Sequence, residues 1–101
     1  MPTSPATTAP ADPMLAEAWA LDGSVALRPE PFGALAYHFG TRKLSFLKTP
    51  ELVDVVRRLE RSVSVEVALR DVGVPGPHWP AYLRALQGLA TSGMIRRRDE
   101  A

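Results

Sequence analysis

The chain has 101 residues, of which 46% are hydrophobic and 23% charged, and its formal net charge is +1. This size fits one small globular domain, and the near-neutral charge lacks the positive field of a protein built to bind nucleic acid. Cysteine is absent, which excludes a disulfide framework, a thiolate nucleophile and an iron–sulfur cluster held by this chain. No apolar run approaches the roughly 18 residues of a membrane span, so we expect a cytoplasmic protein that does not associate with membranes.

The N-terminal segment is rich in proline, alanine and threonine, with four prolines among residues 1–13. Such a composition buries too little apolar surface to offset the entropy of ordering. It also lacks the basic start and apolar run of a secretory signal. We expect residues 1–17 to form a disordered tail. Within the more apolar stretch 14–21, a short helix and an extended lead-in both stay open.

A first strand is predicted at residues 24–28, SVALR, after the turn signal Asp22-Gly23. Its apolar residues alternate, as in a strand with one buried face. Pro29 and Pro31 should end this strand, because proline cannot donate a hydrogen bond to a ladder.

The stretch 33–47, GALAYHFGTRKLSFL, predicts a β-hairpin. Its first arm alternates, and Gly40-Thr41 fits a two-residue type II′ loop, since glycine accepts the positive φ needed at the first position. In the resulting register one face carries the pairs Tyr37 with Leu44 and Leu35 with Phe46, and the other carries His38 with Lys43 and Ala36 with Ser45. The three strands form a meander whose apolar face must be covered by the second half of the chain.

Three helices are predicted in that second half. The first starts at Thr49-Pro50, a hydroxyl cap followed by proline at the first helical position. The second runs from about residue 64 to 72, with Gly73 after its end, and the third opens at Pro80 and closes at Gly93. Gly88 inside the third helix suggests close approach to another backbone. The expected fold is an α+β domain with a three-stranded antiparallel sheet followed by three helices, similar to a winged helix-turn-helix.

No constellation of residues predicts catalysis. His38 and His78 lie far apart and have no metal-ligand spacing, and the acidic residues of the first predicted helix fit a solvated face. The serines lack a GxSxG context, and there is no glycine-rich phosphate loop. We expect a protein that is not an enzyme and has no cofactor.

A winged-helix DNA-binding protein is the alternative function, with Arg96, Arg97 and Arg98 on a wing and Arg84 facing the groove. Against it, the N-terminus of the third helix carries no cluster of basic or amide side chains for reading bases. We therefore expect no nucleic-acid partner.

The last predicted strand, residues 43–47, lies at the edge of the sheet and leaves main-chain groups unpaired. In one interpretation, Lys43 and Lys48 do no more than protect this edge from pairing with other strands. Alternatively, an extended peptide adds to it as a strand, and the two lysines suit an acidic peptide. A third possibility is a dimerising module that pairs this edge with its own copy. We expect a monomer, with a weak dimer left open.

The strings RPEPFG and YHFGTRKLSFLK, followed by YLRALQGLATSGMI, resemble the small peptide chaperones of mycofactocin biosynthesis, which belong to the PqqD-like precursor-peptide recognition family. The resemblance covers residues 18–96 and leaves 97–101 as a charged C-terminal tail. Members of this family bind the leader of a short, ribosomally made precursor peptide beside their third strand, in a groove walled by their third helix. They deliver it to a radical S-adenosylmethionine (radical SAM) maturase, which would carry the iron–sulfur chemistry.

The resemblance thus implies a precursor peptide and a maturase as partners. Placed on this chain by geometry, the peptide contacts are expected at Lys43, Leu44, Ser45, Phe46, Leu47 and Lys48 on the strand side, and at Tyr82, Leu83, Arg84, Ala85, Leu86 and Leu89 on the helix.

Overall fold

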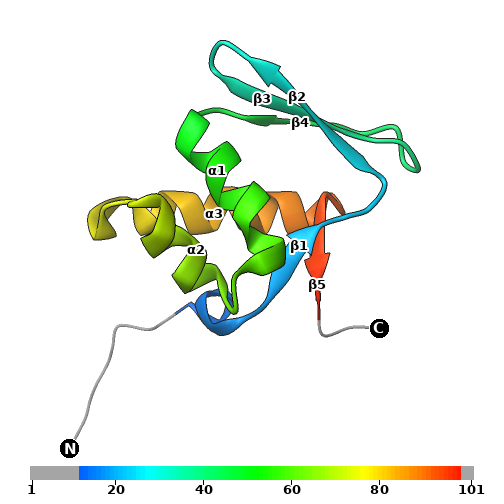
Figure 1. The fold of residues 1–101 in the computed structure, drawn as a ribbon. Coiled ribbons are helices and arrows are strands. Elements are labelled where there is room, and N and C mark those ends of the chain that lie inside the picture. The colour runs from blue at the N-terminus through cyan, green and yellow to red at the C-terminus, as the bar shows by residue number, and fades with distance from the viewer. Residues whose placement is uncertain (1–11, 99–101) are drawn as a thin grey trace, which may run out of the picture.

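The computed structural model describes residues 12–98, so most of the two predicted tails lies outside it. In chain order the elements are the 3₁₀ helix η2 (Pro13–Ala16), the strands β1 (Trp19–Leu21), β2 (Val25–Glu30), β3 (Gly33–His38) and β4 (Leu44–Leu47), the helices α1 (Pro50–Arg58), η3 (Leu59–Arg61), α2 (Val65–Val72), η4 (Gly76–His78) and α3 (Trp79–Thr91), and the strand β5 (Ile95–Arg97). This order confirms the α+β class, with a three-stranded antiparallel sheet and three α-helices (Figure 1).

The hairpin register is confirmed. In the sheet of order β2-β3-β4, Tyr37 lies opposite Leu44 and Leu35 opposite Phe46. The predicted type II′ turn is wrong, because the positive φ falls on Arg42, at 68°, and not on Gly40. The N–H of Arg42 donates to the carbonyl of residue 38 at 2.7 Å, which closes a wider loop than a two-residue turn.

The first strand of the sheet is longer than predicted. β2 continues through Pro29, which pairs with Ala34, to Glu30. The N–H of Phe39 donates to the carbonyl of Ser24 at 2.8 Å. Since neighbouring residues of a strand turn their main-chain groups to opposite sides, position 29 faces away from β3. Pro29 therefore removes no hydrogen bond from the sheet, which is why it does not end the strand.

The helices cover the face of the sheet that carries the smaller side chains. Ala34, Ala36 and Leu47 are buried and face α1, which contacts β3 and β4. Leu44 and Phe46, which the sequence placed on the apolar face to be covered, are 57% and 61% exposed. That expectation is wrong, because α1 packs against two alanines and leaves the larger side chains outside. No helix in the described part of the chain lies over this outer face (Figure 1).

The helix boundaries follow the predicted signals. The hydroxyl of Thr49 accepts a hydrogen bond from the N–H of Leu52 at 3.1 Å and caps α1. Ser64 caps α2 in the same way, and Gly73 ends it with a left-handed φ of 88°. Gly93 follows α3 with a φ of 78°. The buried side chains of the three helices form one core with the inner face of the sheet; the largest are Leu47, Leu59, Leu69, Leu86, Met94 and Ile95.

A second, two-stranded sheet joins the two ends of the described chain and was not predicted. β1 pairs antiparallel with β5, so that Trp19 lies opposite Arg97. The Arg97 guanidinium is 3.2 Å from a carboxylate oxygen of Glu17 and lies over the Trp19 ring, 6.0 Å from its centroid. Arg97, assigned from the sequence to a charged C-terminal tail, is thus the last residue of β5.

Candidate functional site

β4 has an open edge. It pairs with β3 and with no other strand among residues 12–98. The N–H of His38 donates to the carbonyl of Lys43 at 3.0 Å, so the main-chain groups of Lys43 face β3. Along a strand, the main-chain groups of successive residues point alternately toward one neighbour and toward the other side. Ser45 and Leu47 therefore bond inward to β3, whereas the N–H and C=O groups of Leu44 and Phe46 point toward the open edge. These groups are available to an added strand.

The opposite edge of the same sheet is less suited to strand addition. On β2 the outward-facing positions include Pro29, which has no N–H to offer. The N–H of Val25, at another outward position, already donates to the carbonyl of Asp22 at 2.9 Å. The sheet thus has one edge that is blocked and one, β4, that is open.

An elongated groove runs between the β4 edge and α3. Its larger part has a volume of about 450 Å³ and is lined by Ser45, Phe46, Leu47, Lys48, Leu52, Ala85, Gly88, Leu89 and Ser92. A second part of about 260 Å³ is lined by Lys48, Thr49, Leu52, Ala81, Tyr82 and Ala85. The two parts share Lys48, Leu52 and Ala85, so they are continuous. From residue 81 to 92 the α3 wall is roughly 16 Å long, which matches about five residues of an extended peptide.

The α3 wall carries small side chains. A Cβ added at Gly88 would meet no atom within 4 Å, so the predicted close approach of a backbone to this glycine is wrong. Gly88 instead lines the groove beside Ala85. The absence of bulk at these two positions leaves room for the side chains of a peptide.

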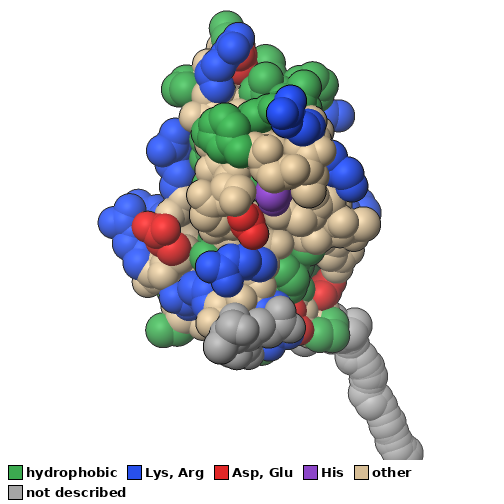
Figure 2. All heavy atoms as spheres, turned by 90° about the vertical axis from the view of Figure 1, so that its right-hand side faces the viewer, with side chains coloured by type: hydrophobic (Ala, Val, Ile, Leu, Met, Phe, Trp, Pro, Cys, Tyr) green, Lys and Arg blue, Asp and Glu red, His purple; other side chains and the backbone are tan. Residues whose placement is uncertain are grey.

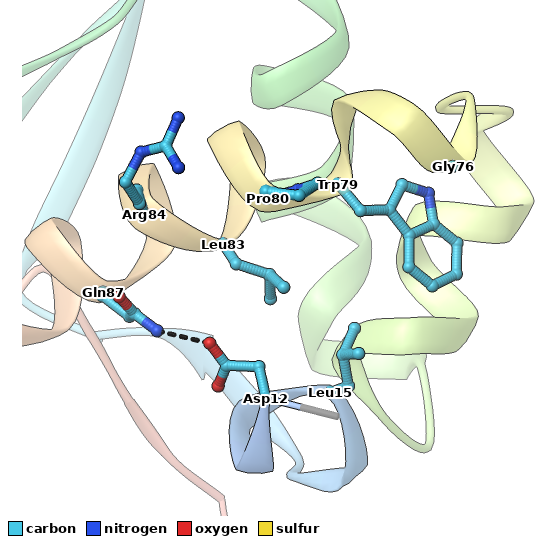
Figure 3. Close-up of a pocket in the computed structure, with 8 residues that line it drawn as sticks. All are labelled: Asp12, Leu15, Gly76, Trp79, Pro80, Leu83, Arg84 and Gln87. Carbon is cyan, nitrogen blue, oxygen red and sulfur yellow. Dashed lines mark hydrogen bonds between the residues drawn. The ribbon is translucent and has the colours of Figure 1, made fainter. Parts of the chain in front are cut away.

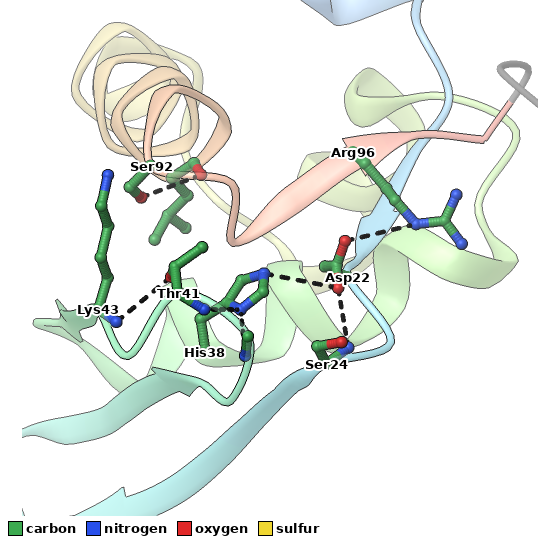
Figure 4. Close-up of polar contacts among 9 residues, drawn as sticks. Asp22, Ser24, His38, Thr41, Lys43, Ser92 and Arg96 are labelled. Carbon is green, nitrogen blue, oxygen red and sulfur yellow. Dashed lines mark hydrogen bonds and ion pairs between the residues drawn. The ribbon is translucent and has the colours of Figure 1, made fainter.

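Two basic side chains lie along the groove, Lys43 near one end and Lys48 where its two parts meet, and none of its described lining residues is acidic. Lys48 lines both parts. Lys43 extends toward Ser92 at the end of α3 (Figure 4). Between them the lining is mostly apolar, with Leu52 and Leu89 in its larger part. This arrangement suits an extended apolar peptide that carries acidic residues.

Of the twelve residues predicted to contact a peptide, the structure brings seven to this groove. They are Ser45, Phe46, Leu47, Lys48, Tyr82, Ala85 and Leu89. Leu86 is fully buried in the core, and the Leu44 side chain lies on the exposed outer face of the sheet. The groove is also lined by residues that were missed: Thr49, Leu52, Ala81, Gly88 and Ser92. The helical spacing 85, 88, 92 contained the signal for the last two.

Leu83 and Arg84 lie at a different cavity (Figure 3). This cavity has a volume of about 430 Å³ and is lined by Asp12, Leu15, Gly76, Trp79, Pro80, Leu83, Arg84 and Gln87. The Gln87 amide donates to a carboxylate oxygen of Asp12 at 2.6 Å, which ties the start of the described chain to α3. Since Leu83 and Arg84 occupy another side of α3, the structure does not place them in the groove beside β4.

The histidine singled out from the sequence has structural contacts. His38 Nδ1 accepts hydrogen bonds from the N–H groups of Gly40 and Thr41 at 3.0 and 3.1 Å (Figure 4). Its Nε2 lies 3.7 Å from a carboxylate oxygen of Asp22. No group of three or more His, Asp or Glu side chains in residues 12–98 is placed to hold a metal ion. Within the same residues, no helix has the length and apolar character needed to cross a membrane.

Comparison with known proteins gives a consistent result. A family model described as the peptide chaperone MftB family matches residues 18–96. The peptide chaperone MftB of Mycobacterium ulcerans (strain Agy99) is 53% identical over 77 residues, which cover 76% of this chain and 71% of that protein. The namesakes in Mycobacterium tuberculosis (strain ATCC 25618 / H37Rv) and Mycolicibacterium smegmatis (strain ATCC 700084 / mc(2)155) are each 51% identical over 77 residues, covering 76% of this chain and 71% and 76% of theirs. No solved structure matches significantly.

Proposed function

Because the chain belongs to the peptide chaperone MftB family, whose role is not enzymatic, we propose that it binds a precursor peptide by strand addition along β4. The peptide is the leader of the short, ribosomally made precursor of mycofactocin. The chain presents this peptide to a radical SAM maturase, which performs the chemistry. The observation that carries the proposal is the open β4 edge beside a groove about 16 Å long.

Main-chain hydrogen bonds supply the first part of the recognition. The outward N–H and C=O groups of Leu44 and Phe46 offer two donors and two acceptors to an extended chain. Each such bond contributes about 0.5 to 1.5 kcal/mol, so the edge alone gives modest affinity for any extended peptide.

Side chains supply the selection. In an added strand alternate residues point into the groove, where Leu52, Ala85 and Leu89 form an apolar lining. Lys43 and Lys48 favour a peptide with acidic residues opposite these two lysines, and repel a basic one. We therefore expect the bound leader segment to be about five residues long and apolar at alternate positions, with acidic residues placed to meet Lys43 and Lys48.

The main-chain mechanism is tested by replacing Phe46 with proline. Phe46→Pro deletes a donor that faces the open edge while the inward bonds of Ser45 and Leu47 to β3 remain. We expect the dissociation constant of the precursor peptide to rise about tenfold or more, because the lost bond leaves a peptide carbonyl unpaired at about 1 to 3 kcal/mol. Titration of backbone amide shifts by NMR measures this change.

The matched control is Phe46→Ala, which removes the same side chain but keeps the N–H. The ratio of the two affinities isolates the main-chain contribution. Equal affinities for Phe46→Pro and Phe46→Ala, with both variants folded, would contradict strand addition. A leader-deleted precursor should fail to bind the unaltered chain.

A further inference from the structure

The outer face of the three-stranded sheet carries an exposed aromatic surface. Phe32 and Phe46 pack edge to face with their ring centroids 6.0 Å apart, and Tyr37 and Phe39 do the same at 5.0 Å. Four side chains of this face, Phe32, Phe39, Leu44 and Phe46, are between 44% and 62% exposed. Figure 2 shows hydrophobic side chains gathered at the upper end of the molecule, over the sheet, with Lys and Arg side chains beside them. We call this surface the outer face; it consists of Phe32, Leu35, Tyr37, Phe39, Leu44 and Phe46.

The outer face is a sizeable exposed apolar surface. Together its four most exposed side chains leave on the order of 400 Å² of mostly apolar area in contact with water. The largest apolar patch of a small protein is often functional. The peptide groove does not account for the outer face, because the groove lies on the α3 side of β4 and includes only Phe46 from this set.

Charge argues against a second copy of the chain as the occupant. Residues 25–48 contain the cations Arg28, Arg42, Lys43 and Lys48 but a single acid, Glu30. That acid already pairs with Arg28 at 3.0 Å. Two outer faces in contact would bring like charges together, which disfavours their association.

The outer face is continuous with the proposed peptide site. A shallow hollow lined by Phe32, Phe46 and Lys48 lies where the outer face meets the open edge. A strand added beside β4 extends the sheet, so half of its side chains would lie beside Leu44 and Phe46 on the outer face. A partner seated there would touch the bound peptide as well as the chain.

We propose that the outer face is the docking surface for the enzyme that modifies the peptide, through an apolar surface on that enzyme rimmed by acidic side chains. This inference rests on the proposed function for the identity of the partner. The enzyme would then approach from the side of the sheet opposite the helices and meet the peptide at the edge of β4. The groove selects the peptide, and the outer face selects the enzyme.

The test is the double variant Tyr37→Thr/Phe39→Ser, which removes one aromatic pair that does not line the groove and keeps strand-compatible residues. Purified radical SAM maturase serves as the probe, and its affinity for the chain is measured by sedimentation velocity. We expect this affinity to fall at least tenfold, while the peptide affinity measured by NMR stays within about twofold. Arg28→Glu should also weaken maturase binding, most strongly at low salt.

Matched controls lie elsewhere on the surface. Val63, in the turn before α2, is 77% exposed, and Val63→Ser should leave both affinities unchanged. Arg61→Glu is the control for the charge reversal. Unaltered maturase affinity in a folded double variant would overturn the proposal, as would a wild-type chain that does not bind the maturase.

Two further outcomes are distinguishable. A wild-type chain that dimerises, and that becomes monomeric in the double variant, would assign the outer face to a second copy and overturn the proposal. If the wild-type chain binds the maturase through the outer face but no peptide, the docking surface stands and the proposed peptide function fails.

Discussion

Gly33 opens β3 at a point where only glycine fits. A Cβ on this residue would lie 2.1 Å from the carbonyl oxygen of Leu47 and 3.1 Å from the main chain of Thr49. Both neighbours are backbone atoms at the junction of β4 and α1, so they cannot move aside as a flexible side chain would. At Gly33 the main chain of β3 thus passes close to the end of β4 and to the start of α1.

We predict that Gly33→Ala destabilises the chain by about 2 kcal/mol or more, because the added methyl group must displace the backbone. Urea unfolding followed by circular dichroism measures the free energy. Gly23→Ala is the matched control, since a Cβ there meets no atom within 4 Å, and it should change stability by no more than about 0.5 kcal/mol. Equal stability of the two variants would show that the backbone at Gly33 can yield.

At the scale of the element, α3 combines a buried stripe with a wall of small residues. Leu83, Leu86 and Leu89 are buried, while Ala85 and Gly88 line the groove. An interior glycine weakens a helix by roughly 1 kcal/mol relative to alanine. The helix therefore keeps a residue that costs it stability at a place where extra volume would enter the groove beside β4.

Substitutions at Gly88 should separate stability from binding. Gly88→Ala is expected to raise the free energy of unfolding by about 0.5 to 1 kcal/mol, because there is space for the methyl group and no positive φ. Gly88→Leu should keep the fold and lower peptide affinity at least tenfold by filling the groove. Thermal unfolding and peptide titration, run on both variants, give the two readouts. Full peptide affinity in Gly88→Leu would place the peptide elsewhere.

The elements that could be predicted from the sequence are those with local signals. Thr49 and Gly73 mark helix ends because a cap or a left-handed φ needs a particular residue type at one position. The hairpin register followed from alternation along residues 33–47. Alternation did not show which face of the sheet is buried. Hydrophobicity favoured the face with Leu44 and Phe46, whereas close packing of α1 requires the small residues of the opposite face.

The sequence likewise predicted part of the candidate site, namely the edge strand, but not the side of α3 that faces it. Its edge strand followed from the order of three strands in a meander, confirmed by the sheet order β2-β3-β4. Which side of α3 faces that edge depends on how the helix is rotated against the sheet, and no local signal fixes this rotation. Leu83, Arg84 and Leu86 were therefore grouped with Ala85 and Leu89, although the structure directs them elsewhere.

At the scale of the whole molecule, β1 and β5 pair and so connect the two ends of the described chain. Each strand has three residues, too few for a periodic pattern, and they pair across more than 70 positions of sequence. Ile95 in β5 is buried, and the N–H of Arg98 donates to the carbonyl of Ala18 at 2.9 Å. Stability of the helical half thus depends on both ends of the described chain.

Deleting residues 95–101 should therefore unfold the chain or lower its stability by about 3 kcal/mol or more, because a buried isoleucine and a strand are lost together. The melting temperature, followed by circular dichroism, measures the effect. Deletion of residues 99–101 alone is the control and should leave it within about 2 °C. If both truncations melt alike, the two-stranded sheet contributes little.

The difference between the two edges of the three-stranded sheet also limits self-assembly of the chain through strand pairing. Fibre growth by strand pairing needs two compatible edges on every copy, so that each copy joined can accept the next. Here β4 can accept a strand, whereas Pro29 interrupts the hydrogen-bonding pattern of β2. Pairing between copies through β4 would end at two, with no edge left to lengthen the assembly. The chain can therefore leave the β4 edge open to an added strand without forming fibres through that edge.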